Sequence, residues 1–210
     1  MRELFDKAKW KHLFYTMTHP TDGYYWVRHQ EKGSVAIALL LVIVFSFAFS
    51  INRMAASFVV SDIEPITVNA LPELGGVLLF YVILCVANWS VTCLMEGEGR
   101  LKDILIAVGY ATLPITCGLA LATVISRFLA ANEEVFYTLI LGVGIAYGVI
   151  LMMIGIMQVH NYTLGKTLST LILTLIAVFI IVFLGMLMYD LVNRLVNFFV
   201  SLYTELSFRG

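Results

Sequence analysis

Charged residues are scarce in this chain. They make up 13% of its 210 residues, whereas hydrophobic residues make up 60%, and the net charge is -1. The mean hydropathy of +0.92 exceeds what the core of a soluble protein of this length requires. The composition therefore argues against a water-soluble protein and favours one built for lipid, and no nucleic-acid partner is expected.

Cysteine is also rare, and its placement excludes a disulfide scaffold. Cys85, Cys93 and Cys117 all lie within apolar runs. There they behave as small hydrophobic residues and are poorly placed for a framework of disulfides. The cysteines consequently identify no redox compartment.

Catalytic motifs are missing as well. The four histidines include no pair one helical turn apart with a glutamate, as a zinc protease requires. Ser90 has no histidine in its own segment, and Asp190 has no second glycine-framed aspartate to share a proton. Gly165-Lys166-Thr167 lacks the first glycine of a phosphate-binding loop. No catalytic, cofactor-binding or metal-binding residue is predicted, and the chain is not expected to be an enzyme.

Long apolar runs are what the sequence does contain. Each is about 20 residues or slightly longer, which is the length that a helix needs to cross a hydrocarbon core of about 30 Å. Backbone groups in lipid must be paired within a helix or a closed barrel, and these runs do not alternate as barrel strands do. We predict an all-α integral membrane protein with a bundle of five transmembrane helices at 33–52, 74–95, 104–126, 135–157 and 167–189.

The basic residues are distributed unevenly around these runs. Six of them precede the first run, and the predicted inner segments hold nine against four in the outer segments. The positive-inside rule therefore places the N-terminus in the cytoplasm and, after five spans, the C-terminus outside the cell membrane. The predicted organisation is an N-terminal cytoplasmic segment 1–32, the membrane domain 33–190 and a C-terminal tail 191–210.

Both ends are expected to form amphipathic interfacial helices. Trp10, Leu13, Phe14 and Met17 share one face of a helix predicted over 1–17. This helix lies either on the inner membrane surface or against the protein's own loops. A turn is predicted at residues 18–23, because proline disfavours helix in the residue before it and Asp-Gly favours a turn.

Polar and small residues inside the spans have two interpretations. Asn88 and the pair Gly144 and Gly148 are typical of close packing between membrane helices. The alternative is a polar cavity for a lipid headgroup or a solute. Pro114 removes one backbone hydrogen bond and is expected to bend the third span.

His160 is predicted near the cytoplasmic end of the fourth span. A charged histidine is costly at this depth, so we expect it to be neutral and hydrogen-bonded, or paired with a carboxylate. The expected partner is Glu96 or Asn88 across the bundle. A proton-sensing role is the alternative.

Several short motifs occur in order along the chain, and together they resemble a known family. They are Asn88-Trp89-Ser90, Glu96-Gly97-Glu98-Gly99, Lys102-Asp103-Ile104 and Gly109-Tyr110-Ala111-Thr112-Leu113-Pro114. This pattern resembles the bacterial branch of the Yip (Ypt-interacting protein) family. The resemblance implies five spans, a cytoplasmic N-terminus, no known catalytic activity and a bacterial plasma membrane. It also suggests an ABC transporter as a partner.

The leading functional hypothesis is a membrane scaffold or adaptor with a cytoplasmic patch for a partner protein. Residues 96–103 of one inner turn are expected to face residues 158–166 of the other, and the alternative is a solvated rim of loops. The candidate interaction or helix-tie residues are Asn88, Trp89, Glu96, Lys102, Asp103, Tyr110, Pro114, His160 and Lys166. Expected partners are membrane lipids and a membrane protein, with a homo-oligomer also open. The alternative function is a small transporter, channel or lipid-translocating protein.

Overall fold

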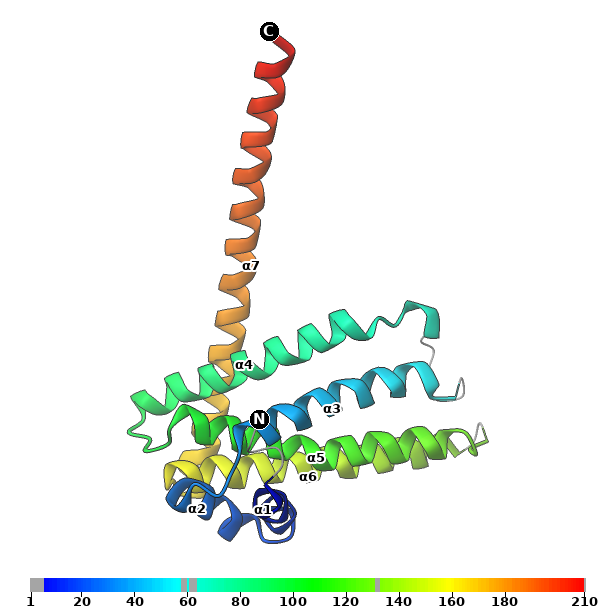
Figure 1. The fold of residues 1–210 in the computed structure, drawn as a ribbon, viewed down its shortest axis with the longest axis vertical. Coiled ribbons are helices and arrows are strands. Elements are labelled where there is room, and N and C mark those ends of the chain that lie inside the picture. The colour runs from blue at the N-terminus through cyan, green and yellow to red at the C-terminus, as the bar shows by residue number, and fades with distance from the viewer. Residues whose placement is uncertain (1–5, 58–59, 61–63, 131–132, 210) are drawn as a thin grey trace.

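The computed structural model describes residues 6–57, 60, 64–130 and 133–209, and this part of the chain contains helices but no β-strand. The helices are α1 (Lys7–Thr18), α2 (Pro20–Gln30), α3 (Val35–Ala55), the 3₁₀ helix η2 (Pro65–Thr67), α4 (Ala70–Leu94), α5 (Leu101–Ser126), α6 (Glu134–His160) and α7 (Leu164–Arg209), as Figure 1 shows.

Five of these helices, α3 to α7, are long and apolar enough to cross a membrane. They correspond one for one to the five apolar runs of the sequence, and the prediction of an all-helical membrane protein is confirmed. The observed helices begin and end within a few residues of the predicted runs, except for the C-terminal end of α7.

Helix α5 occupies the centre of the bundle. It packs against α3 on one side and α6 on the other, while α4 lies along α3 (Figure 1). The fully buried side chains come from all of these helices and from the N-terminal segment, among them Tyr24, Ile37, Ala107, Tyr110 and Leu151. The bundle therefore has one continuous core that reaches into α2.

The contact between α5 and α6 is close enough to require glycine. A Cβ atom built on Gly144 would lie 3.0 Å from the Cα atom of Gly118 and 3.1 Å from the carbonyl oxygen of Pro114. Small residues let membrane helices approach closely, and the dispersion energy of that contact stabilises the pair where lipid offers no hydrophobic gain. The predicted packing role of Gly144 is confirmed.

Helices α1 and α2 cover one end of α6, and α2 corrects the prediction of a turn at residues 18–23. Helix α1 ends at Thr18 as expected, but a new helix starts at Pro20 and includes Asp22 and Gly23 in its first turns. Proline suits the first position of a helix, because its missing N–H would have no partner there, and an acidic residue favours the first turn. Gly23 leaves room for Thr16 of α1.

Helix α1 rests on the protein itself. Leu13 is fully buried, and the hydroxyl of Tyr147 in α6 donates to the carbonyl of Met17. Phe14, from the same predicted apolar face, is 61% exposed. The described part of α1 thus packs on helices α2 and α6, where loops were named in the second alternative, and its place relative to the membrane surface stays a prediction. Residues 1–5 of the predicted helix lie outside the described residues.

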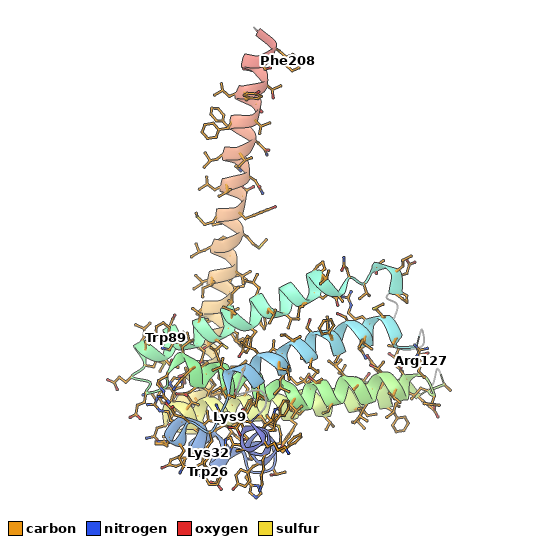
Figure 2. All side chains as sticks on the ribbon, viewed as in Figure 1. Lys9, Trp26, Lys32, Trp89, Arg127 and Phe208 are labelled. Carbon is orange, nitrogen blue, oxygen red and sulfur yellow. The ribbon has the colours of Figure 1, made fainter. Side chains whose placement is uncertain are left out.

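Helix α7 differs most from the prediction. The fifth span and the tail are a single helix of 46 residues, about 69 Å long at 1.5 Å per residue. No glycine or proline follows Gly185 until the last residue, and Arg194 bridges Asp190 one turn away, so nothing stops the helix. Its first part packs on α4, but beyond Val178 the described side chains are exposed, apart from the partly buried Asn193, and the helix projects from the bundle towards Phe208 (Figures 1 and 2).

We predict that Gly144→Val destabilises the bundle and that Gly142→Val does not. A side chain at 144 forces α5 and α6 apart, and such overpacking costs about 1–3 kcal/mol. A Cβ atom on Gly142 meets nothing within 4 Å. Thermal melting in detergent should show a lower midpoint for the first variant alone, and equal midpoints would refute the requirement for glycine.

Candidate functional site

Polar side chains gather at one end of the bundle, which is formed by α1, α2, residues 95–100 and residues 161–163. We call it the capped end. Helices α3 and α5 begin here, and α4 and α6 end here. The buried polar residues of this end come from segments far apart in the sequence, and their geometry determines what the site is able to do.

A buried carboxylate lies at the centre of the capped end. Asp103, in the first turn of α5, has a side chain only 1% exposed. The guanidinium of Arg100 donates to it at 2.9 Å, and Arg28 of α2 approaches to 3.5 Å. A buried charge needs such partners, because removing it from water is costly, and the start of a helix also favours an acidic residue.

A second carboxylate joins α2 to α5 at the surface. Glu31, the left-handed residue that caps α2, accepts from Nζ of Lys102 at 2.7 Å and from Nη1 of Arg100 at 2.8 Å. These hydrogen bonds, with that of Lys102 the larger contribution, lower the pKa of Glu31 below its usual value. Solvent screening makes exposed pairs weak. The energy of the α2–α5 joint therefore comes mainly from the buried Asp103.

His160 closes onto the turn between α4 and α5. The backbone N–H of Gly99 donates to its Nδ1 atom at 3.1 Å, and its ring stacks on that of Tyr162 at 5.2 Å. The hydroxyl of Tyr162 in turn donates to the carbonyl of Met95 at 3.0 Å. We call Gly97, Gly99, His160 and Tyr162 the His160 clasp; it fastens the end of α6 to the turn.

The glycines of this turn provide space. A Cβ atom on Gly97 would lie 2.6 Å from Nδ1 of His160, and one on Gly99 would lie 2.5 Å from its Cε1 atom. No glycine in the described part of the chain has a positive φ, whereas Glu96 has a φ of 55°. The residue in the left-handed conformation that reverses the chain is therefore Glu96. Both glycines are required because a side chain at either position would collide with the imidazole of His160.

The position of His160 agrees with the prediction, but its partner does not. A tie to the turn between α4 and α5 exists, and the donor is the backbone of Gly99, where Glu96 or Asn88 was expected. Glu96 is exposed. Because Nδ1 accepts a hydrogen bond, a neutral ring carries its proton on Nε2, and this atom has no partner in the described part of the molecule.

Asn88 belongs to a different contact, the joint between α4 and α7. Its Nδ2 atom donates to Oγ1 of Thr174 at 3.0 Å. Thr167 and Thr170 are fully buried on the same face of α7. Each of these threonine hydroxyls also donates to a carbonyl of its own helix turn, whereas the buried Oδ1 atom of Asn88 has no partner in the described part of the molecule. This joint is where α7 leaves the bundle.

The remaining predicted site residues are spread over the bundle. Trp89 is 41% exposed on α4, and the buried hydroxyl of Tyr110 accepts the backbone N–H of Ser34 at 3.2 Å. Helix α5 continues without interruption through Pro114. Lys166 places its Nζ atom 4.5 Å from the ring centre of Tyr162. The nine predicted residues therefore form no single patch.

The sequence did not single out Arg28, Glu31 and Tyr162 as functional residues. Arg28 and Glu31 lie on or beside α2, the helix that was predicted to be a turn, so their positions opposite α5 were hidden. The signal that could have revealed α2 is Pro20 followed by Asp22, a typical helix start. As a result, the predicted contact between residues 96–103 and 158–166 is only half right: His160 meets the turn, while Lys102 and Asp103 face α2.

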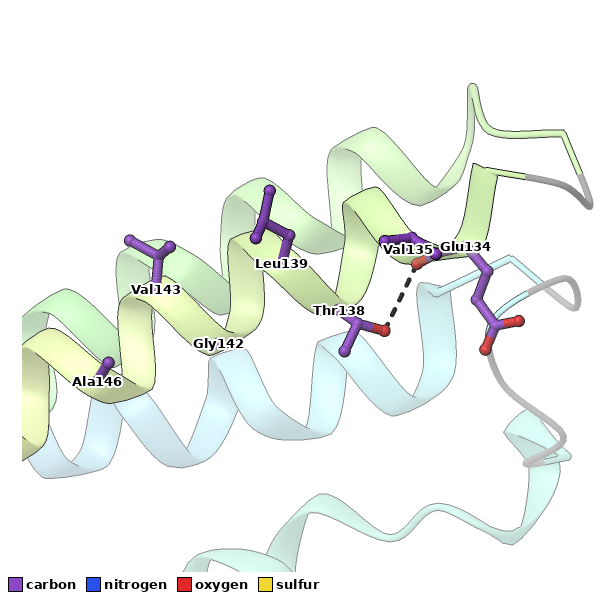
Figure 3. A pocket seen from close by; sticks show the side chains of 7 residues that line it. All are labelled: Glu134, Val135, Thr138, Leu139, Gly142, Val143 and Ala146. Carbon is purple, nitrogen blue, oxygen red and sulfur yellow. Dashed lines mark hydrogen bonds between the residues drawn. The ribbon is translucent and has the colours of Figure 1, made fainter.

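Two hollows away from the capped end are apolar. A groove of about 730 Å³ runs along α6 from Glu134 to Ala146 (Figure 3), where Thr138 donates to the carbonyl of Glu134. A smaller cavity of about 210 Å³ lies between α3, α4, α5 and α6 and is lined almost entirely by apolar side chains. Within the described residues no group of histidine, cysteine and carboxylate side chains is arranged to hold a metal ion.

The comparison with protein families adds one decisive observation. The family model described as the Yip1 domain matches residues 14–186. The chain belongs to the Yip1 domain family. The match to the Yip1 domain extends from the middle of α1 into α7. It includes the capped end from residue 14 onward and the whole His160 clasp. Searches of curated proteins and of solved structures gave no match. The predicted family is confirmed, and its bacterial branch stays a prediction.

We predict that His160→Ala lowers the thermal stability of the Yip1 domain by about 1–3 kcal/mol, because it leaves the N–H of Gly99 without its acceptor. His160→Asn should lose less, since its amide oxygen can still accept. His29→Ala is the control, because His29 is exposed and bonds within its own helix. If all three variants melt alike in detergent, the clasp contributes nothing.

A second prediction concerns the buried carboxylate. Asp103→Asn removes the charge that Arg28 and Arg100 face, and breaking such a buried pair costs about 3 kcal/mol. Asp190→Asn also breaks an aspartate–arginine pair, but this pair is exposed on α7 and should cost under about 0.5 kcal/mol. Equal unfolding midpoints in a denaturant titration would contradict the assignment.

Proposed function

We propose that this Yip1 domain is a non-enzymatic membrane adaptor, which holds a partner membrane protein in the bilayer. The observation that carries this proposal is the exposed part of α7 beyond Val178, which we call the α7 arm. It is apolar, ordered as a helix and uncovered by the described part of the chain. The α7 arm therefore offers a partner helix a long, regular apolar surface for packing.

The length of α7 supports this role. A span of about 20 residues suffices to cross the hydrocarbon core, and α7 has 46. Asn193 and Asn197 lie one helical turn apart on the arm, where they are partly or fully exposed. Amide side chains on membrane helices hydrogen-bond across helix interfaces, and close packing then supplies the rest of the association energy. A partner would thus recognise an apolar helix with an amide pair on one face.

The proposed topology places the capped end in the cytoplasm. Arg28, Arg100, Lys102 and Lys166 lie there together with the lysines of α1, and the positive-inside rule counts such residues near the ends of spans. We propose a plasma membrane location in a bacterium. An ABC transporter, suggested by the family resemblance, is the first partner to test.

The alternative of a transporter gains no support from the site. It requires the polar and small residues of the second, third and fourth spans to line one path. Asn88 instead bonds to α7, Gly144 packs on α5, and Thr112 lines the small apolar cavity. These residues face different neighbours, so we do not propose a transport function.

Affinity purification of the full-length protein in native lipid particles tests the adaptor role. We expect a membrane protein at a fixed stoichiometry, and Asn193→Leu combined with Asn197→Leu should reduce its recovery several-fold, because the arm stays helical and apolar but loses the amide pair. The matched control, Val192→Leu combined with Val196→Leu, should retain the partner. If the parent protein captures no stoichiometric partner, or if both double variants retain it equally, the proposal is wrong.

A further inference from the structure

A pocket of about 490 Å³ lies between α1 and the segment that joins α2 to α3. We call it the α1–α2 pocket. Its walls include Lys9, Lys11, Lys32, His12, Tyr15 and Trp26. Figure 2 shows Lys9, Trp26 and Lys32 gathered at the same end of the molecule. Neither the adaptor role nor the His160 clasp uses these side chains.

The charge of the α1–α2 pocket is positive. Two acidic residues also line it, but both are engaged elsewhere. Asp6 caps the start of α1 by accepting the N–H of Ala8 at 2.9 Å, and Glu31 is held by Arg100 and Lys102 on its other side. Lys11 and Lys32 therefore dominate the potential inside the pocket. Burial, and then the charge of Lys32, lower the pKa of His12 below its usual value.

One wall of the pocket is aromatic. The rings of Tyr15 and Trp26 stack with their centres 5.0 Å apart, and Nζ of Lys32 lies 4.3 Å from the centre of the Trp26 ring. Tryptophan and tyrosine are the residues that favour the headgroup level of a membrane. The wall therefore combines a charge for an anion with a surface for the less polar atoms next to it.

His12 provides an independent indication of a ligand. Its side chain is 7% exposed, and its Nε2 atom has no hydrogen-bond partner in the described part of the molecule. A buried polar atom left unpaired is costly and calls for an explanation. Because His12 belongs to the lining of a basic pocket, a ligand atom that enters the pocket is a suitable partner.

The position of the pocket decides between possible anions. Lys32 precedes the start of α3 at Val35 by three residues, so the pocket lies beside the start of the first candidate membrane span. Phospholipid headgroups occupy this level, and lysine is a common phosphate ligand. We propose that the α1–α2 pocket binds the phosphate group of an anionic phospholipid, with Lys11 and Lys32 on the phosphate and the Tyr15–Trp26 wall beside the glycerol. This proposal does not depend on the adaptor role.

The experiment measures lipid retention by the full-length protein. Native mass spectrometry, after exchange from detergent into mixed micelles, compares phosphatidylglycerol with phosphatidylcholine, and inorganic phosphate is the soluble probe. We expect selective retention of phosphatidylglycerol and about fivefold weaker binding for Lys11→Gln, since a lysine near a membrane contributes about that factor. Lys7→Gln changes the net charge equally but lies outside the pocket lining, so it should bind like the parent.

A second variant separates the pocket from general charge attraction. Ala8 lines the pocket and is exposed, so Ala8→Phe fills the cavity without removing a charge or disturbing the core. It should also lose phosphatidylglycerol. The proposal is overturned if Ala8→Phe binds like the parent, or if Lys7→Gln and Lys11→Gln weaken binding equally. Binding of inorganic phosphate with the same dependence on Lys11, and no gain from lipid, would overturn the lipid assignment.

Discussion

The structure depends on how closely α5 approaches its neighbours. For an apolar side chain, contact with lipid is about as favourable as contact with another helix. Burying such side chains between spans therefore gives little hydrophobic gain. What holds such helices together is dense packing, and at Gly118 and Gly144 the two backbones touch. The same constraint acts along α3, where Gly109 of α5 has Ala38 against it. Because α5 is held between α3 and α6, its first turn has a defined position, and the contacts of the capped end are made to that turn.

Both ties at the capped end follow from the position of that turn. Asp103 sits in the first turn of α5 and is buried because α2 covers it, so Arg28 must face it and α2 is held in place. Two residues before α5 starts, the turn presents the N–H of Gly99 to His160 at the end of α6. One tie is electrostatic and the other is a neutral hydrogen bond with a stacked ring. Together they join the N-terminal helices, α4, α5 and α6 at a single place.

The spans and the Gly144 contact could be predicted from the sequence because each depends on a local pattern: an uncharged run of bilayer length, or two glycines one turn apart. Other features depend on tertiary contacts. Asp22-Gly23 reads locally as a turn, yet the packing of Gly23 on Thr16 keeps it helical. Glu96 takes the left-handed position of its turn, although glycine, which adopts this conformation most readily, stands next to it. The partner of His160 is a backbone N–H, which no residue pattern encodes.

Helix α7 illustrates a different limit. Its continuation past residue 189 follows from the absence of any helix-breaking residue, a local fact, but its direction is set by the α4–α7 joint. An amide inside a membrane needs a hydrogen bond, so Asn88 holds α7 at the position where Thr174 accepts a hydrogen bond from its Nδ2 atom. Beyond Val178 no polar contact with the bundle holds the helix in the described structure, and nearly all of its described side chains are exposed. The joint therefore anchors one end of α7, while the surroundings in the membrane, lipid or a partner, decide what covers the other.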